Sequence, residues 1–445
     1  MLKNRRNTAL PSRLGMLLLT IAVILLPCKG ATPTLSTLYN FTDLSDGGFP
    51  EAGLAMNANG ALFGTTSTGG QFGWGTVFEL EPTKTGGWIE KTIYSFTGGM
   101  DGANPISDLA VGTNNVLYGT TYYGGVYDSG TVFQLAPVAG GGWSQKVLYS
   151  FGSTSGDGAN PAAGLVLGSA GALYGTTYGG GTTGMGTVFV LVPSGGGWTE
   201  KILWTFLGGT DGANPLTDLA LGSNGAIFGT TAQGGSVTNA NGTYEDGGTI
   251  FELTNSISSV WSESVLYTFT GGSDGGYPAS ALIIGPNGTL YGSTFWGGTP
   301  AACAVGDYPK GCGVIYQLAP PTGGPTSWTQ TVLHTFTGHS PDGSHPYRNM
   351  ALNAGGVLFG TTYSGGANVN VCYSNSFAGC GTIFTVKPPK VSGGAWTKLN
   401  LTVFPGSPGS GTPSGVIMSK GGILYGTTIV GGTQGGYGTV FKMTP

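Results

Sequence analysis

Charged residues are scarce in this chain of 445 residues. Asp, Glu, Lys and Arg make up 8% of it, against roughly 25% in a typical soluble domain. The 16 basic residues are scattered along the chain, and the formal net charge is −4. Proteins that bind nucleic acids concentrate Lys and Arg on one face. The composition therefore argues against nucleic acid as a partner.

Long apolar runs are almost absent, and no segment has sustained helical periodicity. The one long run, residues 14–26, follows a basic N-terminus. Its length is typical of a signal-peptide core and is too short to span a bilayer comfortably. We expect a signal peptide over residues 1–30, cleaved after Gly30, and a mature chain without a transmembrane segment. Lipidation of Cys28 is the alternative to its removal.

Cysteine is also rare, with five residues in the chain. Apart from Cys28, these form two close pairs, Cys303 with Cys312 and Cys372 with Cys380. Four cysteines allow three pairings, and the local one closes the shortest loops at the lowest entropic cost. In an oxidising compartment we predict both local disulfides. Free thiols are the alternative.

Glycine and proline, in contrast, are abundant and periodic. The 87 Gly and 25 Pro make up about a quarter of the chain, a fraction that without a period would suggest disorder. Here they recur at fixed places around a motif such as VLYGTTYYGG (116–125). Its GTT or GST triplet begins at Gly64, Gly119, Gly175, Gly229, Gly292, Gly360 and Gly426. A repeat of this length predicts a solenoid, a propeller or an array.

Each repeat contains four short segments with strand character, as residues 105–151 illustrate. The segments PISDLAVG, VLYGTTYY, GTVFQLAP and WSQKVLYSF are rich in β-branched and aromatic residues and are separated by glycine-rich turns. Double glycines supply the positive φ that tight hairpins require. Four antiparallel strands repeated radially are typical of a propeller blade.

The arrangement of the repeats predicts a closed ring. The third-strand motif occurs seven times, the last at Gly438, whereas the Trp-led fourth strand occurs six times. The segment TLYNF (37–41) matches TIYSF (92–96) and supplies the missing strand. We therefore predict an all-β, seven-bladed propeller over residues 31–445, in which the N-terminal strand completes the last blade and leaves no free edge.

The repeat unit also resembles a known family. Its pattern LYGTT-x-x-GG…GTVF-x-L-x-P…GGW…Y-x-F…DG-x-x-P is similar to the GloVer repeat of exported proteins from Gloeobacter, Verrucomicrobia and their relatives, over nearly all of residues 36–445. The resemblance implies export and implies no activity for any residue. With the signal peptide, it predicts a protein that is secreted or lies at the cell surface or in the periplasm of a bacterium.

The motif DG-x-x-P is the first candidate for binding chemistry. Its acids are Asp46, Asp101, Asp157, Asp211, Asp274 and Asp342. A ring of carboxylates could bind Ca²⁺ or another divalent ion, but Asp, Gly and Pro in this order are also typical of a turn. Six copies favour the turn, since a binding site seldom requires so many. We expect no cofactor.

Histidine gives a second candidate, because all three histidines lie in residues 333–346. His339, Asp342 and His345 could supply metal ligands from one loop. A zinc site needs a third or fourth protein ligand in tetrahedral geometry. The alternative is that these histidines are polar substitutions within the repeat.

Three insertions are the third candidate: residues 236–248, 299–312 and 367–380, between the second and third strands of blades four to six. We expect them on the same face as the DG-x-x-P turns, where function concentrates in loops on a rigid scaffold. Aromatic side chains with carboxylates and a Lys suit a glycan or an extended peptide. The candidate ligand-binding residues are Tyr244, Glu245, Asp246, Trp296, Asp307, Tyr308, Lys310 and Tyr373. Tolerated insertion without function is the alternative.

The sequence thus favours a monomeric, exported propeller that binds a polysaccharide or a surface protein without catalysis. One alternative is a glycan hydrolase or lyase that uses acids such as Glu245, Asp246 or Asp307. A hydrolase would need two carboxylates held roughly 5–10 Å apart. The other alternative is a purely structural envelope protein.

Overall fold

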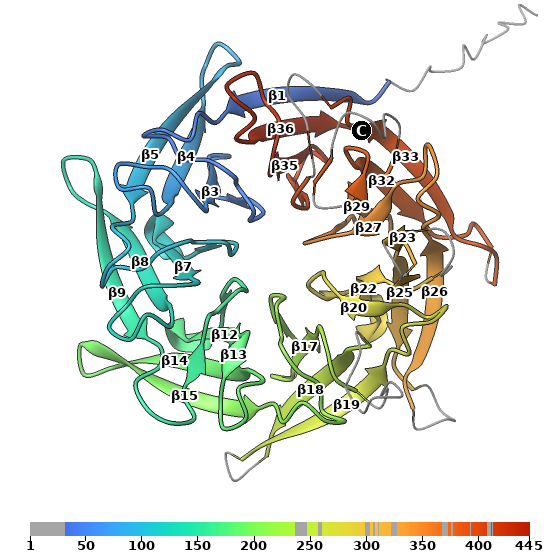
Figure 1. Cartoon of the computed structure of the whole chain (residues 1–445), viewed down its shortest axis with the longest axis horizontal. Helices are drawn as coiled ribbons and strands as arrows, with labels where there is room; N and C mark the ends of the chain where they lie inside the picture. Colours follow the sequence, from blue (N-terminus) through green and yellow to red (C-terminus); the bar gives the residue numbers. More distant parts are fainter. Residues whose placement is uncertain are drawn as a thin grey trace, which may run out of the picture. The chain divides into compact units, whose positions relative to one another are not determined.

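The computed structural model describes residues 32–235, 247–256, 260–298, 303–305, 308–309, 311–321, 327–366, 373–374, 377–391, 393–406, 411 and 413–445. Residues 33–445 form one unit, in which seven antiparallel sheets are arranged in a ring (Figure 1). The predicted all-β, seven-bladed propeller is confirmed. The predicted signal peptide lies outside the described residues.

Blades one to four each contain four strands in chain order from the centre outwards. Blade one consists of β2 (Ala55–Met56), β3 (Leu62–Thr66), β4 (Thr76–Pro82) and β5 (Trp88–Ser95). Blade two consists of β6 (Ala110–Val111), β7 (Leu117–Thr121), β8 (Thr131–Pro137) and β9 (Trp143–Ser150). Blade three consists of β11 (Val166–Leu167), β12 (Leu173–Thr177), β14 (Thr187–Ser194) and β15 (Gly197–Thr205). Blade four consists of β16 (Ala220–Leu221), β17 (Ile227–Thr231), β18 (Thr249–Asn255) and β19 (Trp261–Thr268).

Blades five and six have the same order with one extra inner strand each. Blade five consists of β20 (Gly276–Pro278), β21 (Ile283–Ile284), β22 (Leu290–Trp296), β25 (Val314–Ala319) and β26 (Thr329–Thr335). Blade six consists of β27 (Ser344–Pro346), β28 (Ala351–Leu352), β29 (Leu358–Ser364), β32 (Thr382–Lys387) and β33 (Thr397–Val403). The regular innermost strands have two residues where the sequence predicts eight. The rest of that segment runs as irregular backbone along the axis.

The seventh blade joins the first and last strands that the structure describes. It consists of β34 (Ile417–Met418), β35 (Leu424–Thr428), β36 (Thr439–Thr444) and β1 (Thr34–Asn40). Strand β1 pairs antiparallel with β36, from Thr34 opposite Thr444 to Asn40 opposite Thr439. The predicted closure of the ring by the N-terminal strand is confirmed.

Seven pairs of buried aromatic rings connect each blade to the next. The ring that ends an outer strand packs against a third-strand ring of the following blade, with centroids 5.1–5.4 Å apart. The pairs are Phe41–Phe78, Phe96–Phe133, Phe151–Phe189, Phe206–Phe251, Phe269–Tyr316, Phe336–Phe384 and Phe404–Phe441. Edge-to-face packing of this kind stabilises a core beyond its buried area.

These pairs explain the repeated GTT triplet. A Cβ atom on Gly119 would lie 2.6 Å from the ring of Phe133, so the glycine makes room for the aromatic pair. The first threonine, Thr120, donates a hydrogen bond to the carbonyl of Ala163 in the next blade at 3.0 Å. The second, Thr121, shares a hydrogen bond of 2.9 Å with Thr131 on the paired strand. Each letter of the triplet therefore has its own packing role.

The DG-x-x-P acids are committed to their own turns. Asp101 accepts hydrogen bonds from the backbone N–H of Thr97 and from the hydroxyl of Tyr94, both at 2.9 Å. The same bonds from a backbone N–H and a tyrosine recur at Asp46, Asp157 and Asp274. This arrangement agrees with the turn interpretation, since both partners satisfy the carboxylate within its own blade.

The outer strand of the following blade places an acid beside three of these turns. Glu90, Glu200 and Glu263 are half-buried near Asp46, Asp157 and Asp211, respectively, and burial together with the neighbouring carboxylate raises the pKa of each to about 7. At the equivalent place in other blades, Gln145 and Gln330 donate to backbone carbonyls of the turn. The neutral amide of each glutamine is not repelled by the aspartate of the turn, whereas each of the three glutamates is repelled by it when ionised.

We expect Glu200→Gln to stabilise the protein at pH 8 and to have little effect at pH 4.5. The pKa of Glu200 is higher in the folded than in the unfolded state, so the folded state favours the protonated acid. The contribution of Glu200 to stability is therefore complete below about pH 4.5 and is lost as the pH rises through 7. Because the site is partly solvated, we expect a rise in Tm of only about 1–2 °C. The reciprocal change Gln145→Glu should lower the Tm at pH 8. Thermal melts at both pH values test this, and equal shifts at the two would contradict it.

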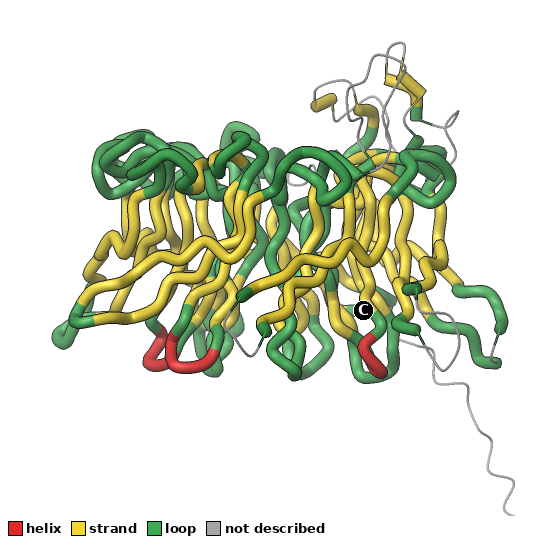
Figure 2. The backbone as a smooth tube through the Cα atoms, turned by 90° about the horizontal axis from the view of Figure 1, so that it is seen from below, coloured by secondary structure: helices red, strands yellow, loops and turns green. Residues whose placement is uncertain are grey.

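The two faces of the ring differ in the length of their loops (Figure 2). The DG-x-x-P turns and the loops between second and third strands form one face, here called the loop face. The opposite turn face carries the short turns η1 (Thr113–Asn115), η2 (Ser169–Gly171) and η3 (Pro286–Gly288). Within the described part of the chain, no helix is long and apolar enough to cross a membrane.

Candidate functional site at the channel mouth

The innermost residue of each blade alternates in character around the central axis. In blades two, four and six, the third residue after the DG-x-x-P proline is polar: Asp108, Asp218 and Asn349. In blades one, three and five, the same place holds Gly53, Gly164 and Ala281. Small residues in alternate blades leave space for the longer side chains of their neighbours.

Each polar side chain is held by the backbone of the preceding blade. The N–H of Gly53 donates to Asp108 Oδ1 and the N–H of Gly164 donates to Asp218 Oδ1, both at 2.6 Å. The N–H of Ala281 donates to Asn349 Oδ1 at 3.3 Å. The same contact thus recurs three times around the ring.

The three side chains then meet across the axis. Asn349 Nδ2 donates to Asp108 Oδ2 at 2.6 Å and to Asp218 Oδ2 at 3.3 Å. Asn349 is 241 residues from Asp108 and 131 residues from Asp218 in the sequence. We call Asp108, Asp218 and Asn349 the axial triad.

Arg348 adds a positive charge beside the axial triad. Other repeats place a small residue here, such as Ala52, Ser107 or Ser280, whereas the Arg348 backbone has φ 62°. Its guanidinium lies over the ring of Tyr347, 5.1 Å from the centroid, and interacts electrostatically with Asp108, Asp218 and Glu51. Nε of Arg348 has no hydrogen-bond partner among the described residues. A non-glycine residue at positive φ often marks a functional position.

The axial triad is enclosed by protein. The cavity between Asp108, Asp218, Arg348 and Asn349 has a volume of about 10 Å³, roughly that needed for one water molecule. Burial raises the pKa of Asp108 to about 7, with a further contribution from the charge of Asp218, and burial also raises the pKa of Asp218. The pair therefore holds a proton more readily than two exposed aspartates would.

Half-buried aromatic side chains surround this polar floor on the loop face. In four blades the residue after the GTT or GST triplet is aromatic: Tyr122, Tyr178, Phe295 and Tyr363. The Phe295 ring lies 5.9 Å from that of Tyr347 and 6.1 Å from that of Tyr363. We call Tyr122, Tyr178, Phe295, Tyr347 and Tyr363 the aromatic rim.

The ligand-binding residues predicted from the insertions are only partly described. Trp296 ends β22, where its ring packs 4.8 Å from that of Phe295 and 5.0 Å from that of His345. Tyr308 lies in β24 (Tyr308–Pro309), which pairs with β23 (Ala304–Val305), and Tyr373 lies in β30 (Tyr373–Ser374), which pairs with β31 (Phe377–Ala378). The remaining predicted residues, Tyr244, Glu245, Asp246, Asp307 and Lys310, lie outside the described residues.

The structure does not bring the predicted metal ligands together. Asp342 pairs with His334 Nε2 at 3.0 Å and with Lys398 Nζ at 2.7 Å. His345 is buried, and its Nδ1 lies 2.8 Å from Ser364 Oγ. In the part of the chain that the structure describes, no three His, Cys, Asp or Glu side chains are grouped so that they could hold a metal ion. His339 therefore belongs to no such group.

One predicted disulfide is confirmed. Cys303 and Cys312 are bonded and have Cα atoms 5.2 Å apart, within the range typical of disulfides. Cys380 is also disulfide-bonded, and its predicted partner, Cys372, lies outside the described residues.

Sequence reasoning did not identify the axial triad or the function of Arg348. The available signal was a departure from the repeat: a carboxylate or an arginine where other units have Gly, Ala or Ser. From the sequence alone, these substitutions do not show that their side chains meet, because the contact depends on how the ring places the blades around one axis.

The fold is a closed seven-bladed propeller with a buried polar cluster across its axis. The chain belongs to the Gloeobacter/Verrucomicrobia repeat family, which matches residues 25–243 and 236–445. No curated protein matches the chain in sequence.

Several solved structures resemble the chain in fold. A protein of unknown function from Dyadobacter fermentans is 10% identical, with a TM-score of 0.44, over 93% of this chain and 99% of its own. A luciferin-regenerating enzyme is 11% identical, with a TM-score of 0.42, over 75% and 88%. A Thermus thermophilus protein described as an oxidoreductase (glucose dehydrogenase) is 14% identical, with a TM-score of 0.38, over 93% and 100%.

Proposed function

We propose that the protein is an exported binding propeller that holds a carbohydrate at the channel mouth of its loop face, without catalysis. The observation that carries this proposal is the aromatic rim around a polar floor of Arg348 and the axial triad. Binding sites commonly combine aromatic walls with a few placed polar groups. The disulfide between Cys303 and Cys312 supports export to an oxidising compartment.

The residues of the channel mouth suit a polyhydroxylated ligand. A sugar ring has apolar C–H faces that pack on aromatic side chains and hydroxyls that need both donors and acceptors. The aromatic rim supplies the first, and Tyr hydroxyls, Arg348 and Glu51 supply the second. Glu51 Oε1 accepts a hydrogen bond of 3.0 Å from Ser67 at this mouth. The Nε of Arg348 is a buried donor beneath this mouth.

The hydrogen bonds of the axial triad argue against catalysis by its carboxylates. A general acid or base must reach the proton that it transfers. Both oxygens of Asp108 and both oxygens of Asp218 are already acceptors, one for a backbone N–H and one for Asn349. These two acids therefore serve to join blades two, four and six.

A glycan array with the oxidised mature chain, followed by calorimetry of the best neutral oligosaccharide, tests the proposal. We expect the double variant Tyr122→Ala/Tyr178→Ala to weaken binding about tenfold, since each aromatic contact contributes about 0.5–1.5 kcal/mol. The control Val391→Ala changes an exposed side chain outside the aromatic rim and should leave binding unchanged. Release of sugar from the array would support a hydrolase instead, and no binding by the parent protein would favour a structural role.

A further inference from the structure

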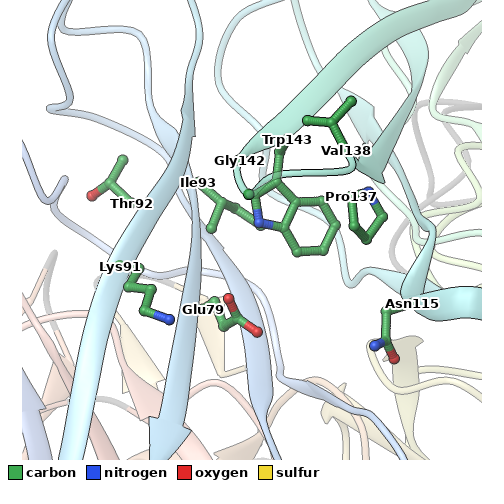
Figure 3. A pocket seen from close by; sticks show the side chains of 10 residues that line it. Glu79, Lys91, Thr92, Ile93, Asn115, Pro137, Val138, Gly142 and Trp143 are labelled. Carbon is green, nitrogen blue, oxygen red and sulfur yellow. The ribbon is translucent and has the colours of Figure 1, made fainter.

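A second cavity lies in the groove between blades one and two, towards the turn face (Figure 3). Its volume is about 450 Å³, within the range of small-molecule sites. Glu79 on β4 and Lys91 on β5 form one wall, and Asn115, Pro137, Val138 and Trp143 of the next blade form the other. We call this cavity the blade 1–2 groove.

Trp143 is held in place by the neighbouring blade. Its indole packs edge-on against the ring of Phe63 in blade one, with centroids 6.0 Å apart and an interplanar angle of 73°. Six repeats have a tryptophan at or next to the start of the outer strand, so the tryptophan itself is part of the repeat. The indole therefore offers the groove a fixed aromatic wall without further ordering.

Asn115 distinguishes this groove from the others. It is the last residue of the turn after the innermost strand, and its backbone has φ 59°. The other six repeats place glycine here, with φ between 75° and 84°: Gly60, Gly171, Gly225, Gly288, Gly356 and Gly422. Glycine adopts this conformation at no steric cost, whereas a side chain there is strained. The turn does not need the amide of Asn115, which instead lines the groove.

Glu79 and Lys91 complete a set of polar groups that no other repeat has. They face each other across the β4–β5 ladder, and Lys91 Nζ also contacts Glu81 at 2.5 Å. Burial and the charge of Glu81 raise the pKa of Glu79. The next groove has Gln134, Lys146 and Gly171 at the three places, and no repeat besides blades one and two combines Glu, Lys and Asn there.

The blade 1–2 groove combines an acid, Glu79, with a base, Lys91, which suits a neutral polar ligand. Glu79 and Glu81 repel an anion, while Lys91 repels a cation. Hydroxyl groups, in contrast, can accept from Lys91 and Asn115 and donate to Glu79. An apolar ring face can pack on Trp143 beside Pro137.

We propose that the blade 1–2 groove binds one ring of a neutral saccharide, in a site separate from the channel mouth. The ligand's ring packs on Trp143, and its hydroxyls bond to Glu79, Lys91 and Asn115. The proposal uses no residue of the aromatic rim or the axial triad, so it stands independently of the function proposed for the loop face.

Indole N–H signals of the ¹⁵N-Trp-labelled, oxidised mature chain test this proposal directly. Trp143→Phe and Trp198→Phe assign the two signals by their loss. The probes are maltotriose, cellotriose, laminaritriose and chitotriose, titrated to about 10 mM. We expect at least one probe to shift the Trp143 signal in a saturable manner. The Trp198 signal, from the next groove, should remain in place.

Two variants of one turn then decide the function of the amide. Asn115→Gly restores the residue of the other six repeats, so the variant should fold normally. Its affinity for the saccharide, measured from the Trp143 signal, should fall about tenfold. Asn114→Gly is the matched control, since Asn114 has φ 57° in the same turn but does not line the groove. A Trp143 signal that no probe moves, or that glucosamine oligomers move instead, would overturn the proposal. Equal affinity in Asn115→Gly would do so as well.

Discussion

Deletion of residues 31–43 is expected to lower the Tm by at least about 10 °C, or to prevent folding. The deletion removes β1, so β36 loses its partner and becomes an unpaired edge. It also removes Phe41, which is fully buried and packs 5.1 Å from Phe78 of blade one. Loss of such a phenylalanine alone costs about 3–5 kcal/mol. Thermal melts and size-exclusion chromatography measure the effect.

Two controls separate ring closure from nonspecific damage. A chain that begins at residue 31 keeps β1 and is the reference against which the Tm of the deletion is measured. Ser36→Cys with Lys442→Cys places cysteines opposite each other in the β1–β36 pair, and the oxidised form should melt at a higher temperature than the reduced form. A truncated chain that melts like its control would refute closure by β1.

Asn349→Asp is expected to lower the free energy of unfolding by about 3 kcal/mol or more at pH 8. The change keeps the shape of the side chain but replaces the amide that donates to both Asp108 and Asp218 with a third carboxylate. An uncompensated buried charge typically costs 3–5 kcal/mol. Denaturant unfolding at constant pH measures the loss.

The pH dependence of this loss distinguishes repulsion from misfolding. Burial already raises the pKa of Asp108 to about 7, and a third acid would raise the pKa values within the cluster further. As the pH falls from 8 to 5, these acids gain protons in the folded state, so the loss should shrink. The control Asn353→Asp keeps an acceptor for the N–H groups of Gly355 and Val357 in the turn between β28 and β29, and should change stability little. A loss that is the same at pH 5 and pH 8 would contradict the electrostatic explanation.

Local pattern was sufficient to predict most of the fold. The period of the GTT triplets, the glycine turns and the β-branched segments predict four strands per blade because each depends on neighbouring residues. The count of third and fourth strands predicted the closure by residues 37–41, which the pairing of Thr34–Asn40 with β36 confirms. The Cys303–Cys312 disulfide was predictable for the same reason, since the loop that it closes is short.

The sequence by itself determined the ring and its closure, because these follow from periodicity and from the order of the strands. Only the tertiary structure decided which residues meet at the axis. Asn349 is 241 residues from Asp108 and 131 residues from Asp218 in the sequence, and neighbouring repeats differ at these positions. Their contact depends on the curvature of the whole ring and on small residues in the alternate blades. The blade 1–2 groove likewise exists only where two repeats pack together, so neither repeat encodes it alone.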